Sequence, residues 1–185
     1  MAKSQLHGLT VQEKLNAMNM DVITVAPTID LDAYADEDSL FALTKIPNAV
    51  AVEGGACLLQ SIMMLDFGEL TDDWTMDLYF FSGDTNSDWP AANAVITGID
   101  SKAKAQNLFY SPNKFLGRLS LSQELYAFPA SSDHKVRIRQ VVNAGLVLKA
   151  NSDSKDVYMA GHLKSLTPDY AAQADLVFHI GVIKD

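Results

Sequence analysis

Apolar and polar residues alternate with a period of two along much of the chain beyond residue 20. The alternation is clearest at 22–25, 75–81, 136–142, 157–163 and 176–183. Successive side chains of a β-strand point to opposite faces of the sheet, so this period predicts strands with one face toward a core. The predicted inward faces include Met76, Leu78, Phe80, Val157, Met159, Gly161, Leu163, Leu176, Phe178, Ile180 and Val182. At 136–142, Val136, Ile138, Gln140 and Val142 share one face and alternate with Arg137, Arg139 and Val141.

Four further apolar runs, at 40–46, 56–67, 115–121 and 145–149, bring the total to about nine predicted strands. Turn-forming clusters of Gly, Pro, Asn, Asp and Ser separate the runs, and no long helical pattern comes between them. Such a pattern is typical of an all-β antiparallel sandwich or a partly closed barrel. We expect a jelly-roll-like β-sandwich of about eight to nine strands over residues 27–185.

Residues 1–26 are predicted to form an N-terminal arm outside this sandwich. The sequence Thr-x-x-Glu at 10–13 matches a helix capping box, and Val11, Leu15 and Met18 follow at helical spacing. A short helix is therefore expected within the arm, and Leu15 and Met18 become candidates for contact with a partner.

Composition and charge narrow the possible functions. The chain has 185 residues, of which 48% are hydrophobic and 20% charged, which suits one globular domain. Its formal net charge of −9 repels phosphate backbones, so we expect no nucleic-acid partner. One cysteine makes neither an internal disulfide nor a cysteine-based zinc site. The sequence predicts neither a secretory signal nor a membrane span.

The sequence offers little that resembles catalytic or metal-binding chemistry. It contains no Gly-x-Ser-x-Gly, no phosphate-binding loop ending in Gly-Lys-Ser/Thr and no His-Glu-x-x-His. Residues 84–88 begin like an EF-hand loop, but Trp89 and Val95 stand where that motif needs Gly and Glu. The acidic string at 30–38 is expected to be a solvated loop. We therefore expect no enzyme, no metal and no cofactor.

Three side chains that often serve as ligands or nucleophiles are expected to be structural. His162 and His179 lie opposite the main apolar faces of their strands and become neighbours if those strands pair. Two histidines without a third ligand are a weak metal signal, so we expect satisfied or surface imidazoles. Cys57 lies in an apolar run and is expected to be a small core residue.

Two pairs of side chains are candidates for partner binding. Arg137 and Arg139 share one strand face, which is either a polar outer face that keeps the sheet soluble or a docking stripe for an acidic surface. Trp74 and Trp89 each follow an aspartate. They either anchor an interface, stack on a sugar or pack over the edge of the core.

Ten short segments follow one another in a characteristic order along residues 27–185. The segments are Pro27-Thr28-Ile29-Asp30, Ala33-Tyr34, Ile46-Pro47-Asn48-Ala49, Gly54-Gly55, Leu59-Gln60-Ser61-Ile62, Asp77-Leu78-Tyr79-Phe80-Phe81, residues 143–150, Asp156-Val157-Tyr158, Thr167-Pro168-Asp169-Tyr170, and 175–185 with its ending Gly-Val-Ile-x-Asp. In their order and spacing the chain resembles a group of small structural proteins of tailed bacteriophages. Residues 1–26 and 83–113 depart from the pattern.

This resemblance implies a non-enzymatic virion component with a β-sandwich body. The expected role is a capsid decoration or cement protein that binds the major capsid protein and assembles as a dimer or trimer. The expected location is the capsid surface, reached by assembly in the host cytoplasm. Two alternatives stay open: a β-module of the tail, neck or fibre, and a carbohydrate-binding adhesion module that uses Trp74, Trp89 or Tyr110.

Overall fold

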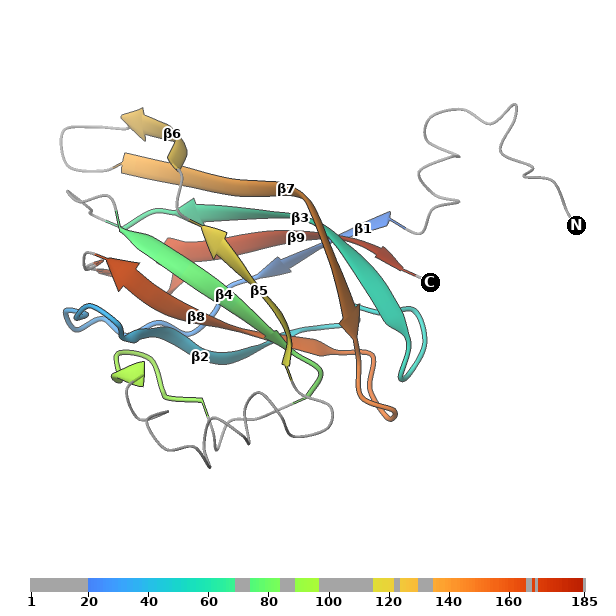
Figure 1. The fold of residues 1–185 in the computed structure, drawn as a ribbon. Helices are drawn as coiled ribbons and strands as arrows, with labels where there is room; N and C mark the ends of the chain where they lie inside the picture. Colours follow the sequence, from blue (N-terminus) through green and yellow to red (C-terminus); the bar gives the residue numbers. More distant parts are fainter. Residues whose placement is uncertain are drawn as a thin grey trace, which may run out of the picture.

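The chain folds as two antiparallel β-sheets packed face to face, so the predicted β-sandwich is confirmed (Figure 1). The computed structural model describes residues 20–68, 74–83, 89–96, 115–121, 124–129, 135–165, 168 and 170–184. Sheet A has the order β1 (Met20–Val25), β9 (Leu176–Lys184), β3 (Ala56–Asp66), β7 (Lys135–Lys149) and β6 (Glu124–Pro129). Sheet B has the order β2 (Ser39–Ile46), β8 (Val157–Ser165), β4 (Thr75–Phe81) and β5 (Phe115–Leu121).

The strand pairs are nested within one another along the sequence. β4 pairs with β5, β3 with β7, β2 with β8 and β1 with β9, all antiparallel. Successive pairs alternate between sheet B and sheet A. The chain is therefore a long two-stranded ribbon rolled into a sandwich, and strands far apart in the sequence lie side by side.

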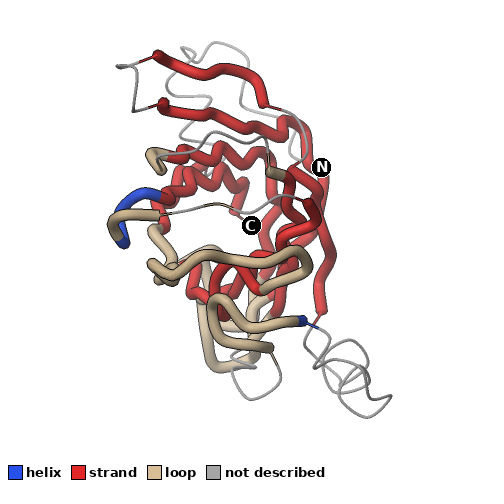
Figure 2. Tube along the Cα trace, turned by 90° about the vertical axis from the view of Figure 1, so that its left-hand side faces the viewer, coloured by secondary structure: helices blue, strands red, loops and turns tan. Residues whose placement is uncertain are grey.

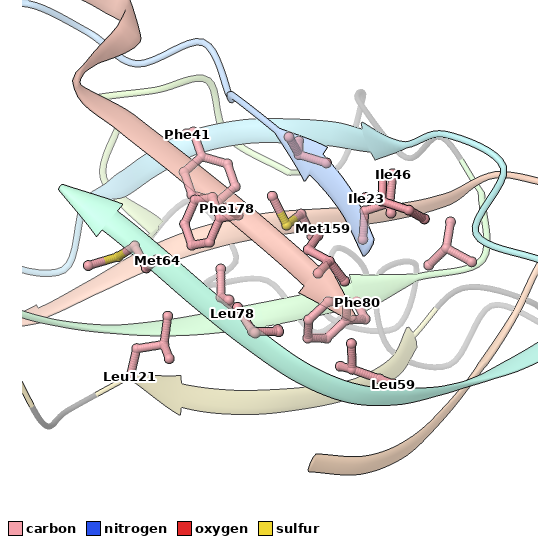
Figure 3. Packing of buried hydrophobic residues seen from close by; sticks show 14 of the residues in the cluster. Ile23, Phe41, Ile46, Leu59, Met64, Leu78, Phe80, Leu121, Met159 and Phe178 are labelled. Atoms are coloured by element: carbon pink, nitrogen blue, oxygen red, sulfur yellow. The ribbon is translucent and has the colours of Figure 1, made fainter. Parts of the chain in front are cut away.

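The core fills the space between the two sheets (Figure 3). Leu59 of sheet A and Leu78, Phe80 and Met159 of sheet B have no exposed area. The predicted inward faces of the strands at 75–81, 157–163 and 176–183 supply Leu78, Met159 and the equally buried Phe178, so those faces are confirmed. Cys57 is also buried in this core, as expected.

One close approach fixes the packing of β2 on β8. The Phe41 ring lies directly over Gly161, where an added Cβ would come within 2.5 Å of a ring carbon. On its other side Phe41 meets Phe178, with ring centroids 5.6 Å apart. Glycine at 161 therefore makes room for an aromatic pair at the centre of the sandwich.

Three elements differ from the sequence-based expectation. The runs at 136–142 and 145–149 form one strand, β7, because a bulge joins them: between the pairs Leu59–Leu146 and Ser61–Val142, three residues of β7 lie opposite one residue of β3. Asn143 and Gly145 take positive φ angles within this bulge. β6 was not predicted, and β1 places residues 20–25 in the sandwich, inside the range assigned to the arm.

Sheet B is covered on its outer side by part of the connection between β4 and β5. Trp89 is buried there against Leu43, Phe81 and Ala160, and its Nε1–H donates to Ser39 Oγ at 3.0 Å. Figure 2 shows the described chain as strands and loops, with a short helical turn at Gln173–Asp175. Within the described ranges, no helix is long and apolar enough to cross a membrane.

Candidate functional site

The two candidate arginines point into the sandwich, and this corrects both interpretations drawn from the sequence. Arg137 is 4% exposed and Arg139 is 0% exposed, so neither forms a polar outer face or an accessible docking stripe. The register explains their direction. Arg137 pairs with Asp66, and Arg139 pairs with Met64, and both partners face inward on β3. A buried carboxylate on the neighbouring strand makes the inward orientation of the arginines favourable.

Asp66 is the centre of this buried polar cluster. Its carboxylate accepts hydrogen bonds from the Gly68 amide at 3.0 Å and from Trp74 Nε1 at 3.1 Å. Burial raises its pKa to about 6, although both hydrogen bonds and the charges of the two arginines act in the opposite direction. Because the cluster is enclosed, its groups serve folding and offer no access to a substrate.

Arg139 is held by an aromatic ring and by the backbone. Its guanidinium lies 4.9 Å from the centroid of the Trp74 ring, within the range of a cation–π contact. Its Nη1 donates to the Leu121 carbonyl oxygen at 3.2 Å. These contacts tie β7 to the end of β5 in the opposite sheet.

Neither candidate tryptophan presents its ring to solvent. Trp74 is 0% exposed and Trp89 is 4% exposed, so both pack against the core or its edge. Of the interpretations drawn from the sequence, edge packing is therefore the one that describes both side chains. The other candidates for partner or sugar binding, Leu15, Met18 and Tyr110, lie outside the described residues.

The two histidines lie in different sheets, so their strands do not pair and the condition for neighbouring rings is not met. His179 on β9 bonds Thr24 Oγ1 at 3.0 Å across the β1–β9 pair. His162 on β8 is buried, and its Nε2 lies 2.9 Å from Glu37 Oε2. The two rings therefore take part in separate contacts on separate sheets.

Glu37 joins His162 to Lys164 on the outer side of sheet B. Lys164 Nζ donates to Glu37 Oε1 at 2.8 Å, and this contact is the main cause of the lowered pKa of the carboxyl. Burial lowers the pKa of His162, with a further contribution from the Lys164 charge, whereas Glu37 acts to raise it. Glu37 has a φ of +67°, a left-handed conformation that is uncommon for glutamate. The expectation of a solvated loop at 30–38 holds for Asp32 and Asp36, which are exposed, but not for Asp38, which is buried and accepts a hydrogen bond from the Ala35 amide at 2.7 Å.

This cluster has the residue types of a hydrolytic triad and the bond between histidine and acid, but not the bond between serine and histidine. Ser39 is the cross-strand partner of His162. Its Oγ is buried, donates to the Phe41 carbonyl oxygen at 3.1 Å and accepts from Trp89. An activated serine needs a hydrogen bond to its base, and this serine is bonded elsewhere. Among the described residues, no group of three His, Cys, Asp or Glu side chains is placed to hold a metal ion.

A shallow apolar hollow of about 480 Å³ lies beside β2, the edge strand of sheet B, where Ile29 forms a β-bridge with Phe41. It is lined by residues 28–31 together with Ala42, Ala91, Ala92 and Gln173. Gln173 fixes one wall, because its side chain bonds both the amide and the carbonyl oxygen of Ile29. Asp30 is the one ionisable residue in this lining, which gives the hollow little chemistry with which to select a ligand.

The charged groups of the site differ in how much of their arrangement the sequence indicates. Asp66 lies near the end of the apolar run at 56–67, where a carboxylate is unusual, but the sequence does not show which strand pairs with it. Glu37 and Lys164 are far apart in sequence, and no local pattern joins them.

Comparisons with known proteins add no relative: no family model matches the chain, and neither the curated proteins nor the solved structures contain a significant match. The functional argument therefore depends on the strand arrangement and on the chemistry described above.

Proposed function

We propose that this protein is a non-enzymatic structural component of a tailed-bacteriophage virion. Its role in this proposal is that of a capsid decoration or cement protein, which binds the outside of the head and stabilises it. The major capsid protein is its partner, and its own copies associate as dimers or trimers on the capsid surface. Assembly takes place in the host cytoplasm.

The strand arrangement is the observation that carries the proposal. In sheet A the order β1-β9-β3-β7 faces β2-β8-β4-β5 in sheet B, and the nested pairs alternate between the sheets. This order supports a jelly roll with β6 as an added edge strand, and jelly rolls are common in viral capsid and lectin domains. The step from fold to function is an analogy, which agrees with the resemblance of the sequence to phage structural proteins.

The chemistry of the described side chains favours the capsid role over the lectin role. Sugar-binding modules commonly stack sugars on exposed aromatic rings, but Trp74 and Trp89 are both buried. In the group of Ser39, His162 and Glu37, the serine is bonded to the Phe41 carbonyl oxygen, so the hydrogen bond that links a nucleophile to its base is missing. A net charge of −9 also suits a protein on the outside of a particle, away from the packaged genome.

The protein composition of purified virions tests the proposal. We expect between about one copy per three shell subunits and one copy per subunit, as binding at repeated lattice points requires. A ratio near one to thirty or below would instead support the tail, neck or fibre module. Complete absence from the particles would refute any virion role.

Particles that lack the protein provide the second test. A cement protein bridges neighbouring capsomers, so its loss is expected to lower the temperature at which heads release DNA. Adding back the purified protein should restore that temperature, which separates cementing from an assembly defect. Equal heat tolerance with and without the protein contradicts the cementing role.

A further inference from the structure

The outer face of sheet A is apolar and exposed. We call it the apolar face, and its members include Met20, Val22, Leu58, Val142, Val147 and Ile183. Val22, Val142 and Val147 are 67%, 61% and 60% exposed. Exposed valines at this density on one sheet face are unusual, because antiparallel sheets that face water normally place polar residues there.

The strand register lines these side chains up in rows across the sheet. Met20 pairs with Ile183, Ile183 with Leu58, and Leu58 with Val147, which gives one apolar row across four strands. At the other end Val177, Leu65 and Ile138 form a second row on β9, β3 and β7. Between the rows lie Val22 and Val142, aligned through Gly181 and Ser61.

The contacts of the core place these side chains on the outside. Their strand neighbours Ile23, Leu59, Met64 and Phe178 are buried between the sheets. A shallow hollow of about 270 Å³ lies at the first row and is lined in part by Leu58, Val147 and Ile183. An apolar side chain of a partner can fit into this hollow.

The distribution of charge limits which surfaces can bind the apolar face. The protein has 23 acidic residues and 14 basic ones, so two copies repel each other over most orientations. The outward positions of β1, β9, β3 and β7 that the structure describes carry no carboxylate, and their ionisable groups are His179 and, at one end, Lys149. Two copies that meet through this face therefore bring together the parts of their surfaces with the least repulsion.

The size of the face matches a modest interface. Four strands about 4.8 Å apart and about eight residues long cover roughly 500 Å² of sheet. Two such faces bury about 1,000 Å², which is the lower bound for a specific association. Two sheets with the same twist also pack face to face readily, as they do inside every β-sandwich.

We propose that the apolar face binds the apolar face of a second copy of this chain, in a symmetric dimer. The contact is isologous: the rows of one copy pack on the rows of the other about a two-fold axis. The inference deepens the self-association in the proposed function by giving it a surface and a symmetry, and it can be tested without a shell or a virion.

Sedimentation velocity of the purified full-length protein tests it, from about 1 to 200 µM, with the wild type expected to dimerise in the micromolar range. Val142→Asp and Val147→Asp each place a carboxylate in the contact of both copies, and each should weaken the dimer at least about tenfold. Val52→Asp is the matched control, because Val52 is 58% exposed in the turn before β3, outside the face. Thermal melts verify that each variant is folded, and Val142→Thr, which keeps the branched shape, replaces Val142→Asp if that variant unfolds.

Two results overturn the proposal. One is a wild type that remains monomeric at about 200 µM, above the expected range of the dimer constant. If Val142→Asp then weakens binding to purified heads, the face belongs to the shell protein. The other is a dimer that Val52→Asp weakens as much as Val142→Asp does. Since virion composition is measured separately, failure here leaves the virion proposal standing.

Discussion

The guanidinium of Arg139 lies over the indole of Trp74 inside a closed β-sandwich, and the same indole donates its N–H to Asp66. Burying a charge costs several kcal/mol unless other groups compensate it. Here an aromatic face, a backbone carbonyl and a nearby carboxylate provide that compensation. This end of the sandwich is therefore stabilised by a buried cluster of charged groups, whereas most protein cores are apolar.

Removing the arginine should destabilise the protein strongly. We expect Arg139→Ala to lower the free energy of unfolding by about 3–5 kcal/mol, because it empties a fully buried site, removes the contact with Trp74 and takes away one of the two positive charges near Asp66. Urea unfolding followed by tryptophan fluorescence measures it. In an Asp66→Asn background the same substitution should cost less, because Arg139 then lacks the attraction of the Asp66 carboxylate and is still repelled by Arg137. If Arg139→Ala costs the same in both backgrounds, Asp66 does not compensate the charge of Arg139.

The pH dependence of stability should carry a signature of Asp66. Its pKa is raised in the folded state to about 6 from an ordinary value of 3.8, so the folded state binds the proton more tightly. The wild type should therefore gain stability relative to Asp66→Asn as the pH falls from 7 to 4, by about 3 kcal/mol for a shift of about two units. Urea titrations at several pH values measure this difference.

Asp156 supplies a control of opposite sign. Its pKa is lowered, mainly by the hydrogen bond from the Asn48 amide, and Lys45 adds to the effect. The wild type should lose stability relative to Asp156→Asn as the pH falls through the lowered pKa. If both comparisons change in the same direction, a global effect of acid explains them and the Asp66 assignment fails.

The Glu37 cluster should be visible in the titration of His162. Glu37 acts to raise the pKa of this imidazole and Lys164 acts to lower it. Glu37→Gln should therefore lower the pKa of His162 further, and Lys164→Gln should raise it. Proton NMR of the imidazole resonances measures both. Shifts in the same direction would show that the two substitutions act through a structural change and not through charge.

The contact of Phe41 with Gly161 predicts a cost for any added Cβ. Gly161→Ala should lower the free energy of unfolding by about 1–3 kcal/mol, because the new methyl group overlaps the Phe41 ring. In a Phe41→Leu background the same substitution should cost less. Equal costs in the two backgrounds would mean that the strain comes from the backbone of β8.

The sequence was sufficient for the fold class and for the faces of several strands. Strict alternation at 75–81, 157–163 and 176–183 placed Leu78, Met159 and Phe178 in the core, where they lie. The pattern failed in β7. There the residues of ordinary core character, Val136 and Ile138, face outward, and the arginines face inward. The pairing with Asp66 on another strand decides that orientation, and alternation within one strand does not contain it.

The bulge in β7 and the burial of Trp89 also depend on contacts between segments that are far apart in the sequence. The bulge at Asn143 and Gly145 resembles a strand break in sequence, because both are turn residues with positive φ. Trp89 follows an aspartate in a polar stretch, and its burial follows from the way its loop covers the outer side of sheet B. Such long-range packing cannot be read from local composition.

The nested pairing also has a consequence for protein synthesis. β9 lies between β1 and β3 in sheet A, yet it leaves the ribosome after every other strand. Until then β1 and β3 have no neighbour on the sides that β9 will occupy, and unpaired strand edges of this kind invite aggregation. The β4–β5 pair can form before then, but sheet A closes only after β9 has left the ribosome. The order of synthesis therefore makes the closing of sheet A a late step of folding.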